Sequence, residues 1–234
     1  MSRLAIITAV LIAGDVQAQD DPLVFTPPPG CVGDLTIQQR SCEVTHIYNC
    51  AADTAGERWN ITFDEYGPRY MGKVDRETQW LESYDLFPTQ RYVLVQPSDD
   101  PLNLTELMET GTDSYDFQQR GQDDVQRFVG YDRIVSEDVV IDGETLLQTE
   151  FSMRRESTKE GDFTMTGTEY VLPRLRHFIS GTYRINRDGA IEEWDLSPVD
   201  FIYPGEPGFF ATTPLYECEP TLARYASPTK GTDQ

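Results

Sequence analysis

A hairpin signal stands in Val139-Val140-Ile141-Asp142-Gly143-Glu144-Thr145-Leu146-Leu147. Two short apolar runs flank the Asp142-Gly143 pair, which readily adopts the positive backbone φ angles that a tight hairpin turn requires. A second pair, Asp188-Gly189, lies between Tyr183-Arg184-Ile185 and Ile191 in the same manner. Both stretches predict antiparallel hairpins.

A period of two extends from these hairpins over most of the chain. Apolar residues alternate with polar ones in segments that contain Trp59, Ile61 and Phe63, Phe151 and Met153, Phe163 and Met165, and Phe201 and Tyr203. Such alternation is typical of half-buried antiparallel strands. Only residues 100–108 have the N-cap, proline and apolar spacing of a short helix, and an irregular strand is the alternative there.

We therefore predict an all-β, mainly antiparallel fold of about eight to ten strands. A single curved sheet, a barrel and a sandwich of hairpin-connected strands all fit this pattern, with at most one or two short helices. Hydrophobic residues make up 38% of the chain and aromatic residues 11%, which indicates a folded core rather than disorder.

The N-terminus predicts export. Residues 1–18 begin with Arg3, continue with an apolar run too short to span a bilayer, and end in the small-x-small pattern Val16-Gln17-Ala18. We expect signal-peptide cleavage near Ala18/Gln19 and a periplasmic or extracellular protein without a membrane span. Residues 19–30 are then an acidic, proline-rich leader, 31–219 a single β domain and 220–234 a flexible tail.

The net charge of the chain limits the classes of partner that it can bind. The chain has 40 acidic and 19 basic residues, which give a net charge of −21. Such a surface repels nucleic acid and anionic lipid, so we expect neither as a partner. The acids are scattered rather than clustered, which favours a role in solubility over a cation-binding surface.

Four cysteines, Cys31, Cys42, Cys50 and Cys218, predict two disulfides in an exported chain. Cys42 and Cys50 bracket one alternating stretch, and an extended strand would separate them by about 26 Å. A disulfide needs Cα atoms within about 7 Å. We therefore expect Cys31 and Cys218 each to pair with one of these two.

No catalytic motif stands out, and the catalytic residues stay unassigned. The chain lacks the zinc-protease, phosphate-loop, dinucleotide and nucleophile-elbow patterns. His46 shares a strand face with Cys42 and Cys50, but oxidised cysteines do not bind zinc, so we expect no metal site and no cofactor. A glycosidase needs two acids at a fixed separation. Acids on or near predicted strands are Glu150, Glu169, Glu192, Glu193 and Asp195.

Curved sheets often enclose a small apolar ligand. The candidate ligand-binding residues are the three tryptophans and two members of a basic segment, namely Trp59, Trp80, Trp194, Arg176 and His177. Core filling is the alternative role for the tryptophans, and pairing with nearby acids for the basic segment. The leading hypothesis is a non-enzymatic exported protein that binds an apolar ligand or an envelope partner. The alternatives are a carboxylate-dependent hydrolase and a structural or assembly factor of the cell envelope.

Overall fold

The computed structural model describes residues 23–218, which form one antiparallel sheet of thirteen strands. The first part of the sheet comprises β1 (Cys31–Gln39), β2 (Glu43–Cys50), β3 (Arg58–Asp64), β4 (Gly67–Val74), β5 (Trp80–Leu86) and β6 (Thr89–Asp100). The second part comprises β7 (Thr112–Arg120), β8 (Val125–Ile141), β9 (Glu144–Ser157), β10 (Phe163–Leu172), β11 (His177–Arg187), β12 (Ala190–Asp195) and β13 (Pro198–Ile202). The all-β prediction is confirmed. The expected strand number was too low because several hairpins turn within two residues.

Consecutive strands from β1 to β12 are neighbours in the sheet, so the chain forms a long meander. The β8–β9 hairpin turns at Asp142 and Gly143, whose φ angles are 46° and 79°. The β11–β12 hairpin turns at Asp188 and Gly189, with φ angles of 51° and 90°. Both hairpins predicted from Asp-Gly pairs are confirmed.

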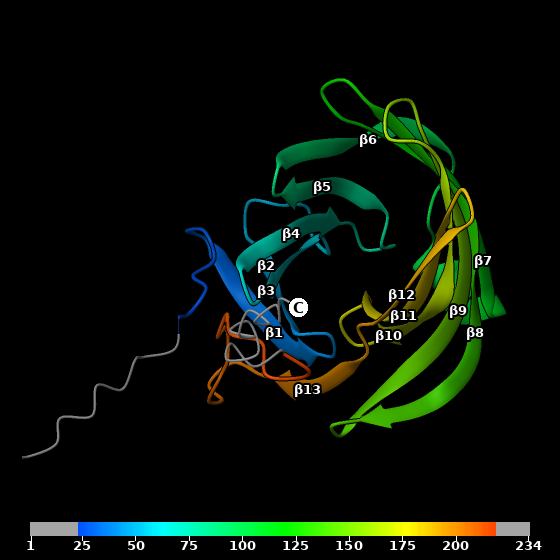
Figure 1. The fold of residues 1–234 in the computed structure, drawn as a ribbon. Coiled ribbons are helices and arrows are strands. Elements are labelled where there is room, and N and C mark those ends of the chain that lie inside the picture. Colours follow the sequence, from blue (N-terminus) through cyan, green and yellow to red (C-terminus); the bar gives the residue numbers. More distant parts are fainter. Residues whose placement is uncertain (1–22, 219–234) are drawn as a thin grey trace, which may run out of the picture.

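The sheet curls strongly but does not close (Figure 1). β12 pairs with β11 at one edge and β13 pairs with β1 at the other, although only Leu196 and Ser197 separate β12 from β13. The chain crosses between the edges here. The Leu196 amide donates to the Gly181 carbonyl at 2.8 Å, and the Arg40 amide donates to the Ser197 carbonyl at 3.1 Å. This crossing brings β11 into contact with β13 and bounds the interior of the curled sheet.

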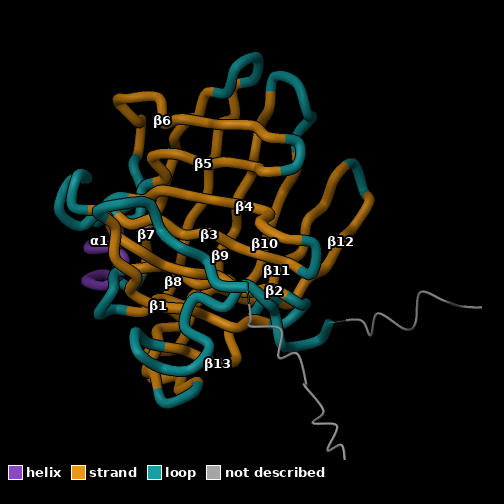
Figure 2. Tube along the Cα trace, turned by 90° about the vertical axis from the view of Figure 1, so that its left-hand side faces the viewer, coloured by secondary structure: helices purple, strands orange, loops and turns teal. Residues whose placement is uncertain are grey.

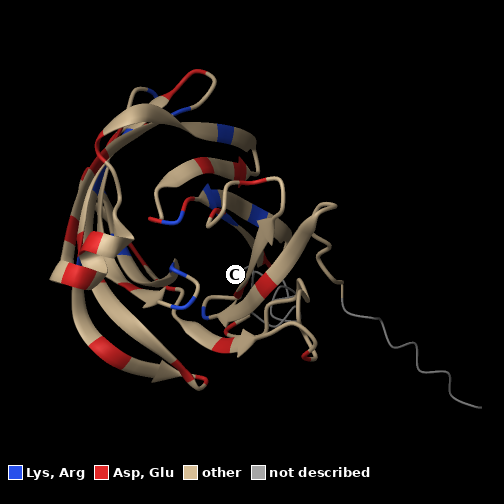
Figure 3. Ribbon diagram, turned by 180° about the vertical axis from the view of Figure 1, so that it is seen from behind, with Lys and Arg blue, Asp and Glu red and all other residues tan. Residues whose placement is uncertain are grey.

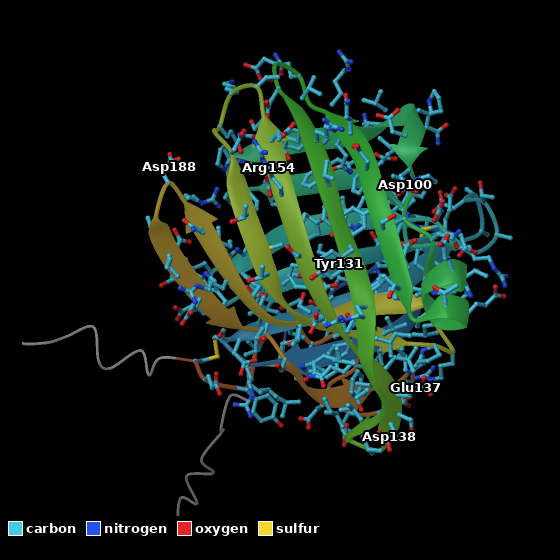
Figure 4. All side chains as sticks on the ribbon, turned by 90° about the vertical axis from the view of Figure 1, so that its right-hand side faces the viewer. Asp100, Tyr131, Glu137, Asp138, Arg154 and Asp188 are labelled. Atoms are coloured by element: carbon cyan, nitrogen blue, oxygen red, sulfur yellow. A yellow bond between two sulfur atoms is a disulfide. The ribbon has the colours of Figure 1, made fainter. Side chains whose placement is uncertain are left out.

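The two faces of the sheet are packed differently. The outer face of β1–β3 is covered by segments near both ends of the described chain, where Phe25, Phe209 and Phe210 pack on an apolar cluster that includes Val44 and Phe63. Figure 2 shows loop segments running over this side of the sheet. The outer face of β7–β9 is open instead, and Figure 4 shows Tyr131 near the middle of β8 on that face.

Two disulfides fix the N-terminal strands. Cys31 and Cys50 pair across β1 and β2 with a Cα–Cα distance of 3.9 Å. Cys42, in the β1–β2 turn, pairs with Cys218 near the end of the described chain with a Cα–Cα distance of 4.6 Å. The prediction of two disulfides is confirmed, as is the exclusion of a Cys42–Cys50 bridge.

One short helix, α1 (Leu104–Thr110), connects β6 to β7. The Asn103 side chain caps its N-terminus by accepting from the Glu106 amide at 3.0 Å. Residues 100–108 therefore contain a helix, but the cap is Asn103 rather than Asp100 because β6 continues through Asp100. Leu104 and Leu107 are buried against Val171 of β10, which docks the helix on the sheet.

The predicted signal peptide, residues 19–22 of the leader, residue 219 and the predicted tail 220–234 lie outside the described residues. Within residues 23–218, no helix is long and apolar enough to cross a membrane. Acidic residues are spread over many strands and loops rather than gathered on one element (Figure 3).

Candidate functional site

A cavity of about 180 Å³ lies inside the curled sheet. Its polar lining includes Asn60, Tyr70, Asp132, Glu169, His177 and Ser180. Its apolar lining includes Trp80, Phe151, Met165 and Phe178. A second cavity of about 100 Å³ shares Asn60, Tyr70 and His177 with the first, so the two are neighbours. The interior is thus both polar and apolar, and it is not filled by side chains.

Strand register brings the two cavity acids into the interior. Asp132 of β8 lies opposite Phe151 of β9 on one side and Asp113 of β7 on the other. Glu169 of β10 lies opposite Ser180 of β11, next to an irregularity in the β10–β11 ladder at Gly167. Side chains alternate across a sheet, so an acid at an inward position of a buried strand is carried into the cavity.

Two glycines leave room for the polar groups of the site. A Cβ atom at Gly72 would lie 2.6 Å from Asn60 Oδ1 and 2.9 Å from the Tyr70 hydroxyl. A Cβ atom at Gly130 would lie 2.7 Å from the Tyr115 hydroxyl. Any larger residue would displace these side chains, so the glycines help to shape the cavity and to hold Tyr115 over β8.

The acids of the interior are held toward their protonated forms. Burial raises the pKa of Asp132 well above its ordinary value, and the nearby Glu169 and Asp113 raise it further. Burial likewise raises the pKa of Glu169 to about 7. Burial raises the pKa of Asp113 to about 6, although its carboxylate accepts a hydrogen bond from the Asn103 amide at 2.9 Å. Within residues 23–218, neither the Asp132 nor the Glu169 carboxyl forms an ion pair.

His177 completes the polar lining. Its side chain is 3% exposed, and its Nδ1 atom has no hydrogen-bond partner among the described residues. Burial, assisted by the positive charge of Arg58, lowers the pKa of His177 to about 4, so the ring is neutral at physiological pH. Asn60 Oδ1 is also buried without a partner in this part of the chain. A buried polar atom without a partner costs roughly 1–3 kcal/mol, which a bound ligand would recover.

The structure brings together two of the five residues proposed from sequence, Trp80 and His177, and adds Glu169 from the set of strand acids. Trp59 lies instead on the outer face, where it stacks on Tyr48 and its Nε1 donates to Asp53 at 2.8 Å. The other strand acids lie away from this cavity.

Arg176 has a structural position. Its φ angle is 48°, and it lies in the β10–β11 turn. Its guanidinium donates to the Arg76 carbonyl at 3.0 Å, to Glu77 at 2.7 Å and to the Thr105 hydroxyl at 2.8 Å. These bonds join that turn to the β4–β5 loop and to α1, so the charge of Arg176 is already paired.

Trp194 lies on the edge strand β12 and is 43% exposed. It lines a shallow groove with Tyr183, Glu193 and Asp195. This groove is separate in its lining from the central cavity. Glu150, on β9, pairs with Arg133 at 2.6 Å.

His46 is fully buried on the outer face of β2, where the rings of Phe25 and Phe210 pack on it. Its Nδ1 lies 3.0 Å from the Thr36 hydroxyl, and its ring lies 4.9 Å from that of Phe210. Burial lowers its pKa to about 3. Both cysteines of its strand face are in disulfides, and no group of three metal-ligating side chains occurs in residues 23–218.

Sequence reasoning missed Asp132, Asn60 and Tyr70. Asp132 had a usable signal, because it continues the inward alternation of Phe128 and Gly130 with a charged residue. An acid at such a position must be paired, protonated or functional. Asn60 and Tyr70 had none, since polar residues at strand positions are common.

Chemically, the cavity offers hydrogen-bond acceptors, exchangeable protons and an aromatic wall in one space. Comparison of the chain with protein family models, with curated proteins and with solved structures finds no match. The function is therefore argued from the residues of the cavity themselves.

Proposed function

We propose that this is an exported β-rich binding protein that holds a small ligand inside its curled sheet. The observation that carries the proposal is the cavity of about 180 Å³, whose lining in residues 23–218 includes two carboxyls without an ion pair and a buried histidine whose Nδ1 has no hydrogen-bond partner. Cavities that serve only packing are apolar and dry, whereas polar groups gathered around a void need a partner.

The two disulfides support an oxidising compartment, in agreement with the signal peptide proposed for residues 1–18. Residues 23–30 of the proposed leader do not hang free of the domain, since the Phe25 amide donates to the Phe210 carbonyl at 2.8 Å. The protein would thus be exported to the periplasm or the exterior as one disulfide-crosslinked domain.

The lining refines the ligand expected from sequence. Trp80, Phe151 and Phe178 offer apolar contact, while Asp132 and Glu169 offer polar contact. An amphipathic molecule therefore fits better than a purely apolar one, because an apolar ligand would bury these carboxyls without a partner. Binding pockets for drug-sized molecules occupy roughly 300–1,000 Å³, so the ligand is smaller than these.

Native mass spectrometry of the protein purified from its own host tests this proposal. We expect a co-purifying small molecule, and we expect it to be lost when Ser180→Leu fills the cavity. The matched control is Ser152→Leu, which lies on the other face of β9 from Phe151 and Met153 and should retain the molecule. A mass equal to that of the polypeptide alone, or a ligand retained by Ser180→Leu, would contradict the proposal.

A second candidate is the carboxylate-dependent hydrolase. The raised pKa values of Asp132 and Glu169 favour it, because a general acid must still hold a proton at neutral pH. A screen of chromogenic glycosides and esters tests it. Hydrolysis that is abolished by Asp132→Asn and by Glu169→Gln, but not by Glu150→Gln on the same sheet, would establish an enzyme.

A further inference from the structure

We infer that the ligand of the central cavity is a small organic cation, a protonated amine on a compact apolar body, held by Asp132 and Glu169. This inference rests on the proposed ligand-binding function and names the chemical class of the ligand. Its foundation is the contrast between these two acids and the other buried or half-buried acids of the chain.

Elsewhere, acids withdrawn from solvent have cationic or hydrogen-bonding partners. Arg58 pairs with Asp34 at 3.2 Å, and Lys73 pairs with Asp53 at 2.7 Å and with Glu57 at 2.6 Å. Asp113 and Asp124 are buried without an ion pair, but they accept hydrogen bonds, from the Asn103 amide at 2.9 Å and from the Thr158 hydroxyl at 2.7 Å. Within residues 23–218, the carboxyls of Asp132 and Glu169 have neither an ion pair nor such a hydrogen-bond donor. Buried carboxylates are normally paired with a cation or bound to a metal.

The basic residues around the cavity are already engaged. Lys73 lines the cavity, but its ammonium group is held by two acids and lies over the ring of Trp59. Arg176, in the turn before β11, is held by Glu77 at 2.7 Å. A cation that neutralises Asp132 and Glu169 must therefore come from outside the described chain.

The unpartnered atoms of the cavity match an ammonium group. Asn60 Oδ1 can only accept a hydrogen bond, and a neutral histidine ring has one accepting nitrogen. A primary ammonium carries three donors and no acceptor. Such a group would bond to a carboxylate and to these neutral acceptors at once, whereas a carboxylate ligand has no donor to offer to them.

The walls and the volume define the rest of the ligand. Trp80, Phe151 and Phe178 present aromatic surface, which attracts cations as well as apolar groups. An apolar cavity of roughly 150 Å³ accepts benzene. A cavity of about 180 Å³ therefore fits a ligand only slightly larger than benzene, such as an aromatic ring with a short aminoalkyl arm.

Binding of a cation here is coupled to proton release. The ionisable groups that line the cavity beside the two acids are Tyr115 from β7, Tyr70 and Lys73 from β4, Glu82 from β5 and His177 from β11, and Asp113 of β7 adds its charge. Lys73 is the cation among them, and it is paired with Asp53 and Glu57. In the absence of ligand the acids therefore retain protons. A bound ammonium would replace these protons, so the affinity rises as the pH rises from 6 to 8.

Isothermal titration calorimetry of the full mature protein with three matched probes tests the inference. Benzylamine is the cation, benzyl alcohol its neutral isostere and benzoate the anion. We expect benzylamine to bind at least tenfold more tightly than the other two and to bind about tenfold more tightly at pH 8 than at pH 6. Titrations in two buffers of different ionisation enthalpy should show protons released on binding.

Isosteric variants locate the site. Glu169→Gln and Asp132→Asn should each weaken benzylamine binding at least tenfold and leave benzyl alcohol within twofold. Glu150→Gln, on the outer face of β9, should change neither. Equal or tighter binding of benzyl alcohol or benzoate, or benzylamine binding that survives both substitutions, would overturn the inference. Failure of all three probes to bind would overturn it as well, while a ligand seen by native mass spectrometry would still uphold the proposed binding function.

Discussion

Each of the two histidines of this chain is buried, one on each face of the sheet, and their surroundings differ. His46 lies on the outer face of β2 between aromatic rings, with Phe210 at 4.9 Å, and a hydroxyl lies at 3.0 Å from its Nδ1. His177 lies at the inner face, where it lines two neighbouring cavities together with Asn60 and Tyr70. The outer region, around His46, is closely packed and crosslinked by disulfides. The inner region, around His177, contains the cavities and their polar side chains.

Burial and a lowered pKa therefore do not by themselves identify a histidine as part of a functional site. Both rings are neutral at physiological pH because burial disfavours their charged forms. What distinguishes His177 is the space beside it and the two unpaired carboxyls that share this space. Stability should therefore reside mainly in the His46 region and ligand binding in the His177 region.

The largest expected effect concerns the two disulfides of the outer region. Loss of the Cys42–Cys218 bridge, which spans 176 residues, should lower the free energy of unfolding by about 5 kcal/mol. Loss of the Cys31–Cys50 bridge, which spans 19 residues, should lower it by about 3 kcal/mol, because a shorter loop restrains the unfolded chain less. Urea unfolding of the two double Cys→Ser variants under non-reducing conditions measures both. A larger loss for Cys31–Cys50 would contradict this ranking.

Truncation of one side chain in each region should show that the outer region is more tightly packed than the inner one. Phe210→Ala removes a ring that is 4% exposed from the packed outer cluster, so we expect a loss of about 3–4 kcal/mol. Met165→Ala removes a side chain that already borders a void, and its loss should be about 1–2 kcal/mol. Thermal and urea unfolding of both variants provide the test. Equal losses would mean that the inner region is as tightly packed as the outer one.

The acids of the inner region should make the protein less stable as the pH rises. The pKa of Glu169 is raised in the folded state to about 7, so between its unfolded value of 4.5 and that pH the native state binds more protons than the unfolded state. The free energy of unfolding therefore falls over this window as the pH rises. Glu169→Gln removes this loss and should be more stable than the wild type at pH 8, by about 3 kcal/mol, but not at pH 4.

Urea unfolding at a series of pH values measures this difference. The matched control is Glu150→Gln, whose side chain pairs with Arg133 on the outer face, and which should change stability by less than about 0.5 kcal/mol at every pH. A Glu169→Gln variant that is less stable than the wild type at pH 8 would show that this carboxylate has a cationic partner.

The sequence predicted the scaffold well because its signals are local. Asp-Gly pairs set the φ angles of the β8–β9 and β11–β12 turns without help from distant residues. A Cys42–Cys50 bridge could be excluded in the same local way, because an extended strand would separate the two Cα atoms by more than a disulfide can span. The crossing at Leu196 and Ser197 was not predictable, because it depends on hydrogen bonds to Gly181 and Arg40 from distant strands.

The site was only partly predictable. Glu169 belonged to a set of strand acids from which sequence gave no reason to choose, since the choice depends on which face of a curled sheet each acid occupies. Its neighbour Asp132 comes from β8, and the register that brings β8 and β10 to the same cavity is set through β9 between them. The sequence of a single strand does not show how that strand is aligned with strands elsewhere in the sheet.

The smallest expected effect is spectroscopic, and it separates the two regions most directly. The chain has only two histidines, so a spectrum of the imidazole nitrogens contains one ring from each face. Addition of benzylamine should shift the His177 resonances, because the ligand occupies the cavity that this ring lines and offers a donor to its unpartnered nitrogen. The His46 resonances should stay in place, since its ring is enclosed by Phe25, Phe63 and Phe210. A conservative His46→Gln variant assigns the spectrum. Equal shifts at both rings would mean that the ligand acts on the whole sheet rather than in its interior, and the distinction between a stapled outer region and a binding inner region would fail.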